Sequence, residues 1–289
     1  MEQSKRRHMT ELSTTATTTQ ELTESAYRRL KRVFSELRAS RTRSWRWCVP
    51  GFEEGLEWLL KHPHDVHCGV YMSDTPGKEV WHLALPKRFG PLEVVYKMYL
   101  QPMSLWDMFE ESDALRESRN YAVLESLGVR TAEVLACGEQ RSLGTVMQSF
   151  IVTRFIPDTI NGSWFMPGGV YGEDADMRMA FSRKTLETIA LTHQCRFFHN
   201  ALHPHKILVR MADGTADSME LTFIDVTSAG FRPKHGGYML AIARDLLTLF
   251  VDLRLSSDEI KLLCAYYIEL NPTSGFTPDS LWRMLVSLG

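Results

Sequence analysis

Side chains that could carry chemistry gather between Leu191 and Asp225. A polar loop in this stretch, called here the histidine loop, holds three histidines and one lysine, in the order His199-Asn200-Ala201-Leu202-His203-Pro204-His205-Lys206. An imidazole accepts a proton near neutral pH, and a lysine carries a compact positive charge that suits phosphate. Asp225 offers a carboxylate, an oxygen ligand of the kind that Mg²⁺ binds. These residue types favour phosphate chemistry.

The histidine loop lies between a helix that we expect from about Met177 to Phe198 and two short apolar strands. The strands are expected at about Ile207 to Arg210 and Leu221 to Ile224. This order is that of a protein-kinase catalytic core, in which a magnesium-binding acid follows the second strand. Asp225 is therefore the predicted magnesium ligand. The alternative is a strand-end aspartate that caps the turn at Thr227 and Ser228.

The histidine loop matches the kinase sequence H-R-D-L-x-x-x-N only in part. His199 and Leu202 fit, whereas Ala201 stands at the position of the catalytic Asp and Lys206 at that of the Asn. A positioned acid or base contributes about 10²–10⁴-fold to rate, so the missing carboxylate lowers activity without abolishing it. We expect His199 or His203 to accept the hydroxyl proton. Lys206 would stand in for one metal ion by placing its charge near the phosphates.

The same kinase pattern requires a strand lysine and a helical glutamate upstream. Lys97 lies in the middle of a predicted strand from about Glu93 to Leu100. Glu117 lies on a helix predicted from about Ser104 to Leu127, and it shares a face with Ala114, Tyr121 and Leu124. Because an unpaired buried charge costs several kcal/mol, we predict one ion pair between Lys97 and Glu117 beneath the nucleotide phosphates. The alternatives are a solvent-facing lysine on an edge strand and a partly exposed helix acid.

Three antiparallel strands are predicted at about Val66 to Ser73, Glu79 to Leu85 and Glu93 to Leu100. A kinase places its phosphate-covering loop at the first turn of this run, where the chain reads Asp74-Thr75-Pro76-Gly77-Lys78 without a G-x-G-x-x-G. Backbone amides near Gly77 and the ammonium of Lys78 are candidate contacts for phosphate. The alternative is an ordinary Pro-Gly turn.

Other polar side chains have structural interpretations. His193 shares a stripe with Leu186, Ile189, Ala190 and Phe197 on the long helix and is expected to be a hydrogen-bonded core histidine. Asp245 lies on the first of two helices predicted at about Leu240 to Leu253 and Ser257 to Leu270; it either braces the histidine loop or pairs on the surface. The loop histidines lack a carboxylate or thiolate at helical spacing, which argues against a zinc-type site.

A resemblance to a known family is carried by the segments Val95–Tyr99, Ala114–Glu117, Leu124–Glu139, His199–Val209 and Ile224-Asp225. The chain resembles the lipopolysaccharide core kinase family, the heptose and Kdo kinase group, and within it the InaA-type branch of protein-kinase-like proteins. The histidine loop is similar to the branch sequence H-x-x-L-Y-P-K-H-I-F. His203 replaces the Tyr, and His205-Lys206 inverts the Lys-His pair. Members of the branch often lack the loop Asp, and this chain has Ala201 at that position.

The resemblance implies an α+β, bilobal protein-kinase-like fold with a small antiparallel β lobe and a larger helical lobe. We expect a disordered tail at 1–25, the first lobe at 26–154 and the second at 155–289. The resemblance also implies an ATP- and Mg²⁺-dependent phosphotransferase that acts on a heptose or Kdo hydroxyl of the lipopolysaccharide core. The alternative is a pseudokinase with a regulatory or scaffolding role. Small-molecule kinases of the aminoglycoside or choline type normally keep the loop Asp, so Ala201 argues against them.

Composition limits the environment and the partners. The chain has 289 residues, 44% of them hydrophobic, and a net charge of -2, which excludes a bulk polyanion binder and predicts no nucleic-acid partner. Its five cysteines form no C-x-x-C pair and fit a reducing cytoplasm. No run of about 18 apolar residues could span a membrane. The composition does not predict an oligomeric state.

A basic segment at 26–43 precedes the alternating sequence Ser44-Trp45-Arg46-Trp47. Such a segment could lie on an anionic membrane surface, giving peripheral contact with the inner membrane. The favoured alternative is a solvated helix face followed by a strand whose tryptophans pack into the small lobe.

Overall fold

The chain forms two compact units in the computed structural model, which describes residues 44–62, 69–73, 77–100, 111–142, 145–232 and 237–289. Of these residues, the sheet unit contains 44–122 and 131–157, and the helical unit contains 123–130 and 158–289. The predicted tail at 1–25 and the basic segment at 26–43 lie outside the described residues. The fold is α+β, with an antiparallel sheet in one unit and most of the helices in the other.

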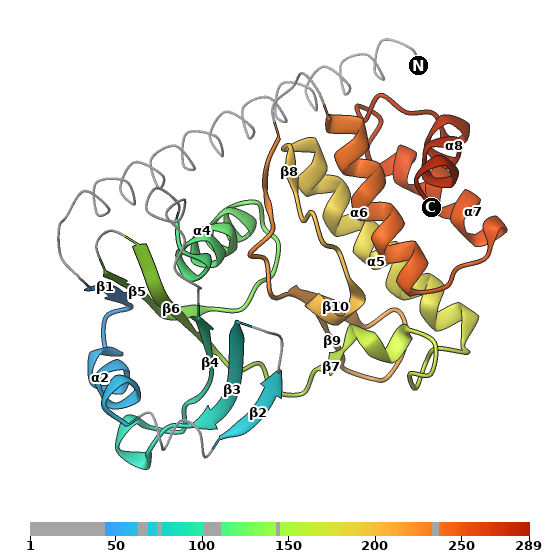
Figure 1. Ribbon diagram of the computed structural model, residues 1–289. Helices are drawn as coiled ribbons and strands as arrows, with labels where there is room; N and C mark the ends of the chain where they lie inside the picture. The colour runs from blue at the N-terminus through green and yellow to red at the C-terminus, as the bar shows by residue number, and fades with distance from the viewer. Residues whose placement is uncertain (1–43, 63–68, 74–76, 101–110, 143–144, 233–236) are drawn as a thin grey trace, which may run out of the picture. The chain divides into compact units, whose positions relative to one another are not determined.

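Six strands build the sheet unit in the order β1-β5-β6-β4-β3-β2 (Figure 1). They are β1 (Ser44–Cys48), β2 (Val70–Ser73), β3 (Lys78–Ala84), β4 (Glu93–Leu100), β5 (Val134–Ser142) and β6 (Thr145–Arg154). Each neighbouring pair is antiparallel. Strand β4 pairs with β3 on one side and β6 on the other, so Lys97 is not on an edge strand. The alternative of a solvent-facing edge lysine is therefore wrong.

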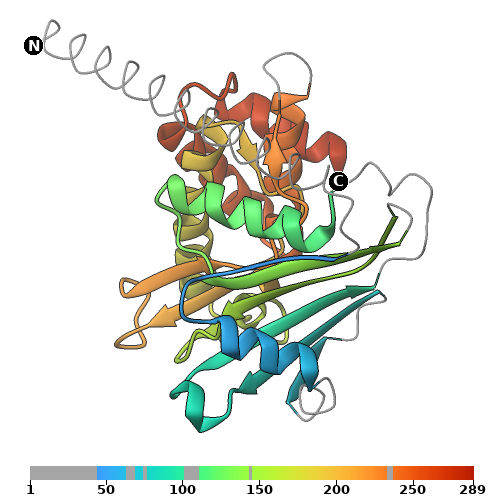
Figure 2. The same ribbon diagram turned by 90° about the vertical axis from the view of Figure 1, so that its left-hand side faces the viewer.

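Helices cover both faces of this sheet (Figure 2). Helix α2 (Glu53–Lys61) packs on one face, where Leu56 and Tyr96 belong to a common buried core. Helix α4 (Asp113–Ser126) lies on the other face. Because successive side chains of a strand point to opposite faces, Lys97 points away from the core that holds Tyr96 and toward α4. The sequence predicted α4 from about Ser104, and the residues before 111 that the prediction included are outside the described part.

Strand β1 contains the predicted tryptophan segment. Trp47 is 44% exposed, and the neighbouring Arg46 forms an ion pair with Glu57 of α2 at 2.5 Å. The prediction that both tryptophans pack into the small lobe is therefore wrong for Trp47. The side chain of Trp45 lies outside the description.

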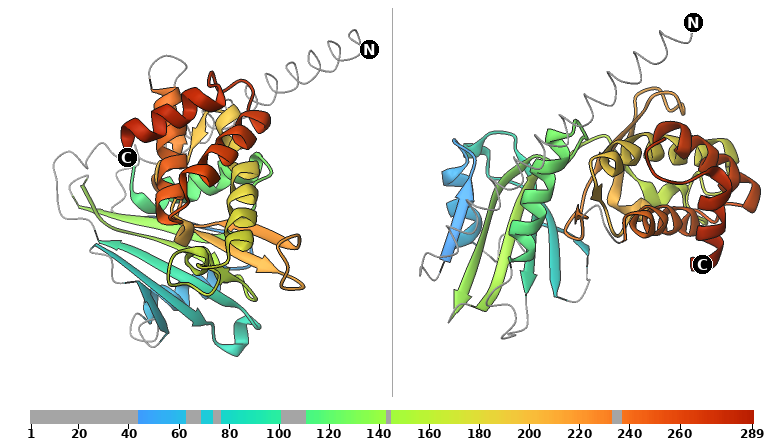
Figure 3. Two further views of the ribbon diagram at one scale, coloured as in Figure 1. Left: turned by 90° about the vertical axis from the view of Figure 1, so that its right-hand side faces the viewer. Right: turned by 90° about the horizontal axis from the view of Figure 1, so that it is seen from above.

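Four helices dominate the helical unit (Figure 3). They are α5 (Ala175–Gln194), α6 (Tyr238–Asp252), α7 (Ser257–Leu270) and α8 (Pro278–Leu288). Side-chain caps start three of them: Asp174 accepts a hydrogen bond from the Met177 N–H, and Ser256 and Thr277 form capping boxes. The sequence did not predict α8. No helix in the described ranges has the length and the apolar character needed to cross a membrane.

Short strands frame the histidine loop in the helical unit. They are β7 (Ile160–Asn161), β8 (Phe197–Phe198), β9 (Ile207–Met211), β10 (Met219–Phe223) and β11 (Gly230–Phe231). Strand β9 pairs with β10 and β7, and β8 pairs with β11. The two strands predicted around the loop are thus present as β9 and β10, and they set the loop's end and Asp225 side by side.

The long helix ends earlier than predicted. We expected it to reach Phe198, but α5 stops at Gln194, and Phe197 and Phe198 belong to β8. Arg196 adopts a left-handed backbone conformation, with φ of 61°, which a continuing helix does not allow. Apolar periodicity continued past the turn because both phenylalanines are buried in the strand as well.

Candidate active site

Lys97 and Glu117 form the predicted ion pair within the sheet unit. Lys97 Nζ lies 2.7 Å from Glu117 Oε1, and the two side chains are only 10% and 0% exposed. The hydroxyl of Tyr121 donates to the same oxygen at 2.9 Å, and the hydroxyl of Tyr99 donates to Oε2. The Glu117 carboxylate therefore receives hydrogen bonds from three side chains on two elements, which fixes its position.

A buried ion pair of this kind is weak evidence for stability. Desolvation of both ions offsets most of their attraction, and well-packed apolar side chains often stabilise a fold more. What the arrangement does provide is a fixed ammonium group: Lys97 comes from the middle of β4, and Glu117 comes from α4. Such a group can bind a phosphate oxygen with little further loss of side-chain freedom.

Lys78 is the first residue of β3, after Gly77 with φ of 78°. In the register of the sheet, Lys78 lies opposite Tyr99, and Val80 lies opposite Lys97. Residues directly opposite each other in an antiparallel pair point to the same face, so Lys78 shares the sheet face of Lys97. The rest of the predicted phosphate turn, 74–76, is outside the described residues.

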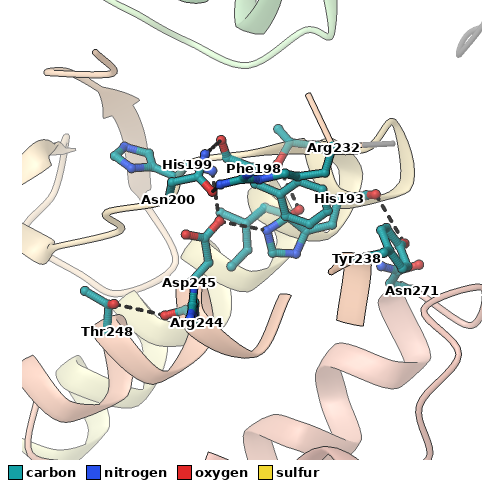
Figure 4. Close-up of polar contacts among 12 residues, drawn as sticks. His193, Phe198, His199, Asn200, Arg232, Tyr238, Arg244, Asp245, Thr248 and Asn271 are labelled. Carbon is teal, nitrogen blue, oxygen red and sulfur yellow. Dashed lines mark hydrogen bonds and ion pairs between the residues drawn. The ribbon is translucent and has the colours of Figure 1, made fainter. Parts of the chain in front are cut away.

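Asp245 braces the histidine loop from α6 (Figure 4). Its Oδ2 accepts a hydrogen bond from the backbone N–H of His199 at 2.8 Å and lies 3.2 Å from His193 Nε2. Asp245 is 1% exposed, so the surface-pair alternative is wrong. His193 Nδ1 lies 2.8 Å from the Tyr267 hydroxyl, which confirms His193 as a hydrogen-bonded core histidine.

His199 has an environment unsuited to the proton-accepting role that the sequence suggested for it. The ring is buried, its centroid is 6.1 Å from that of Phe223, and neither ring nitrogen has a hydrogen-bond partner among the described residues. Burial lowers the pKa of His199 to about 4, although the charge of Asp245 acts in the opposite direction. The neutral ring is closed off from solvent and packs as part of the loop's support.

Asn200 holds the loop from its other side. Its backbone is left-handed, with φ of 59°, a conformation that Asn adopts more readily than most residues. The side-chain Nδ2 donates to the carbonyl oxygen of Ser228 at 2.9 Å, and Oδ1 accepts from Arg232 at 3.2 Å. The residue that follows, Ala201, is therefore presented from a loop whose backbone is fixed on both sides.

His203 is oriented by a carboxylate from α6. Its Nδ1 lies 2.7 Å from Asp252 Oδ2, and its ring stacks on that of His205 with centroids 5.0 Å apart. The side chain of His203 is 36% exposed. With Nδ1–H donated to Asp252, Nε2 is the nitrogen with a lone pair for a proton. Of the two histidines predicted as bases, His203 is the one that is partly exposed and oriented by a carboxylate.

Lys206 and Asp225 lie together at the ends of β9 and β10. Lys206 Nζ is 3.8 Å from Asp225 Oδ2, and the side chains are 12% and 22% exposed. The backbone N–H of Ile224 donates to the carbonyl oxygen of Lys206 at 2.9 Å, which ties the two segments together. The structure thus joins two of the predicted site residues.

The residues around Asp225 fit one magnesium ion in part. A carboxylate is the expected protein ligand, and Mg²⁺ in nucleotide sites takes its other ligands from phosphate and water. Within the described ranges, no three His, Cys, Asp or Glu side chains gather as a metal site. Asp225 would therefore be the protein's carboxylate ligand for such an ion.

A family model now decides the relationship that the loop sequence suggested. The model of the lipopolysaccharide kinase (Kdo/WaaP) family matches residues 97–267, more than half of the chain. The chain belongs to the lipopolysaccharide kinase family. A solved structure of WaaP in complex with acyl carrier protein is similar to this chain, with a TM-score of 0.58 and 18% sequence identity over 84% of this chain and 94% of that one. This likeness shows that the α+β fold is protein-kinase-like. No curated protein matches the sequence.

The match to the lipopolysaccharide kinase family begins at Lys97 itself. Besides Lys97, the match covers the predicted site residues Glu117, His199, His203, Lys206 and Asp225. Lys78 lies before the matched region, so its predicted contact with phosphate has support only from its place on the same sheet face as Lys97.

Two partners of the site residues in this lipopolysaccharide kinase family member were missed in the sequence. Tyr99 stands two residues after Lys97 on the same strand face, a spacing that could have identified it. Asp252 lies 49 residues from His203, and no local pattern connects them. Its one unusual feature is a negative charge at the C-terminal end of a helix, where the helix dipole disfavours it.

A hollow of about 350 Å³ lies in the sheet unit, lined in part by Tyr96, Met98, Phe150 and Glu139. Tyr96 and Met98 alternate with Lys97 and therefore point to the opposite sheet face. The hollow includes none of the predicted site residues, and we assign it no role in phosphate chemistry.

Proposed function

We propose that this protein transfers the γ-phosphoryl group of ATP to a hydroxyl of a lipopolysaccharide core sugar, a heptose or Kdo. The observation that carries the proposal is the buried pair of Lys97 and Glu117, because a fixed ammonium in the middle of a sheet suits nucleotide phosphates. Membership of the lipopolysaccharide kinase family supports the reaction class. The InaA-type branch suggested by the loop sequence is part of this proposal.

Each candidate residue has a separate task in this reaction. Lys97 contacts the nucleotide phosphates, Glu117 positions Lys97, and Lys78 adds a second cation from the same sheet face. Asp225 binds Mg²⁺, which would neutralise phosphate charge when bound. His203 accepts the proton of the sugar hydroxyl through Nε2. It takes the task of the kinase loop Asp, whose position is occupied here by Ala201.

The proposal sets the reaction at the cytoplasmic face of the inner membrane. Support for a reducing compartment comes from the described cysteines, Cys48, Cys137, Cys195 and Cys264, which are all free thiols. The exposed side chains of Arg46 and Trp47 on β1 are the part of the basic aromatic segment that the structure describes. A basic and aromatic strand of this kind would support peripheral contact with anionic lipid or phosphorylated core.

A second candidate function is a nucleotide-binding scaffold without turnover. Ala201 is the observation that favours it, because the catalytic-loop acid of kinases is the substrate base. The scaffold and the kinase both predict ATP binding that depends on Lys97. They differ only in whether phosphate reaches a sugar.

The deciding experiment has a binding part and a transfer part. Thermal shift with ATP, with and without Mg²⁺, tests binding in the wild type and in Lys97→Met. Transfer of labelled γ-phosphate to lipopolysaccharide core oligosaccharide is then measured from pH 5 to 9 for the wild type and Ala201→Asp. Labelled sugar from either protein supports the kinase. ATP binding with no labelled sugar from either protein rejects the kinase in favour of the scaffold.

A further inference from the structure

The ammonium group of Lys206 lies beside Asp225, the acid that the proposed function assigns to Mg²⁺. Lys206 Nζ lies 3.8 Å from Asp225 Oδ2, with both side chains largely removed from solvent. In the kinase loop pattern this position is an Asn, a neutral residue that holds the second Mg²⁺. The chain thus has a permanent positive charge where the pattern has a metal ligand.

Hydrogen bonds of the main chain hold the backbones of Lys206 and Asp225 next to each other. Lys206 ends the short 3-10 helix Pro204–Lys206, directly before β9, and Asp225 follows β10. Ile207 and Phe223 are paired in the ladder of these two strands, and Ile224 N–H donates to the carbonyl oxygen of Lys206. Asp225 has a left-handed backbone with φ of 54°, a conformation that Asp adopts more readily than most residues other than glycine.

The electrostatic consequence follows from charge alone. A fixed ammonium near the Asp225 carboxylate neutralises part of its charge and repels a divalent cation that approaches the same oxygens. Low exposure reduces screening by water and salt. The same ammonium attracts phosphate oxygens, as a metal ion would.

We propose that Lys206 supplies the positive charge that a second metal ion brings in the kinase pattern, so that nucleotide binding by this protein depends only weakly on divalent metal. The inference rests on the proposed function, because it requires that the protein binds a nucleoside triphosphate. It assigns Lys206 to the phosphates and leaves Asp225 able to take at most one metal ion with low affinity.

The test is ATP affinity, measured by titration calorimetry in excess EDTA and again in excess Mg²⁺. Four full-length proteins are compared: the wild type, Lys206→Asn, Lys206→Asn with Asp225→Asn, and the exposed-lysine control Lys261→Asn, whose side chain is 54% exposed. In the wild type and the control, Mg²⁺ should change the affinity by less than about threefold, a difference well below 1 kcal/mol. In Lys206→Asn, affinity in EDTA should fall, and Mg²⁺ should restore it by about tenfold or more.

Asp225 must be the source of that new metal dependence. The double variant should therefore lose the rescue by Mg²⁺ while it keeps the weak binding in EDTA. Melting temperatures without ligand show whether each variant is folded, and Lys206→Met with the same two titrations replaces Lys206→Asn if the latter unfolds; it should lose affinity in EDTA.

Three results would overturn the inference, and they differ from a failure of the proposed function. The first is a wild type that needs Mg²⁺ as strongly as Lys206→Asn does. The second is rescue by Mg²⁺ that persists without Asp225. The third is unchanged affinity in EDTA when Lys206 is replaced. If the wild type binds no ATP under either condition, the proposed function itself is rejected and the inference falls with it.

Discussion

The carboxylate of Asp245 accepts a hydrogen bond from the backbone N–H of His199, which lies 46 residues earlier in the chain. The contact is with the loop's main chain and does not depend on which side chain occupies position 201. The shape of the histidine loop can therefore persist although Ala201 replaces the catalytic Asp. This relationship separates the integrity of the loop from its chemistry, and each can be tested alone.

The brace predicts a large effect on stability. Asp245→Ala should leave His193 Nε2 and the His199 N–H without their acceptor in a buried region, and this should cost about 2–4 kcal/mol in the free energy of unfolding. Urea denaturation measures it. Asp258→Ala, which removes a carboxylate that is 91% exposed, is the control and should stay within about 0.5 kcal/mol of the wild type. A loss below about 1 kcal/mol for Asp245→Ala would contradict the brace.

The ion pair in the sheet unit predicts coupled effects on stability and binding. Lys97→Met should weaken ATP binding and should destabilise the protein by about 3–5 kcal/mol, because Glu117 is left buried without its cation. Adding Glu117→Gln should recover part of the stability and none of the binding. Chemical denaturation and calorimetric titration measure the two quantities.

Lys87→Met is the matched control for that experiment, since Lys87 is an exposed lysine of the same unit. It should change neither stability nor ATP affinity. If the double variant were as unstable as Lys97→Met alone, the buried Glu117 charge would not be the source of the loss.

Burial of His199 predicts a pH dependence of stability. The pKa of His199 is lowered to about 4 in the folded protein, against about 6.5 for an unperturbed imidazole in the unfolded chain. Between these values the unfolded state binds more protons, so stability falls as pH decreases from about 6.5 to about 4, by up to about 3 kcal/mol. Above about pH 6.5 the ring is neutral in both the folded and the unfolded state, so His199 no longer makes the stability depend on pH. Urea midpoints across this range measure it.

His199→Gln separates this histidine from other titrating groups. The variant should be less stable at pH 7 because an amide replaces a neutral ring in a closed site, but its stability should fall less between pH 6.5 and 4 than that of the wild type. An unchanged slope would show that other groups cause the acid sensitivity.

The contact between His203 and Asp252 predicts unequal losses of phosphate transfer. If transfer occurs, His203→Gln should lower it by about 10²-fold or more, the effect of removing a positioned base. Asp252→Asn should lower it less, because His203 Nε2 remains but its orientation is weaker. His62→Gln, at an exposed histidine after α2, should have no effect. Equal rates for His203→Gln and the wild type would assign the base to another group.

Local patterns in the sequence predicted most of the elements that hold the site. A run rich in β-branched and aromatic residues predicted β4 with Lys97 in its middle, and helical spacing placed Glu117 and Tyr121 on one face of α4. The strands around the loop were predicted as well, because their apolar runs are short and bounded by polar turns. These features depend on neighbours within a few residues, which the periodicity of a strand or helix records directly.

Tertiary structure decided which carboxylates contact the histidine loop. The partners of the loop, Asp245 and Asp252, lie 46 and 49 residues from the residues that they contact. Many carboxylates in the chain could satisfy the same donors, so no local pattern selects among them. The burial of His199 and the end of α5 at Gln194 also depend on packing against distant segments. Sequence periodicity thus defined the elements and the candidate side chains, whereas long-range packing determined which histidine is buried and which is oriented for chemistry, because burial and hydrogen bonding are properties of the folded surroundings.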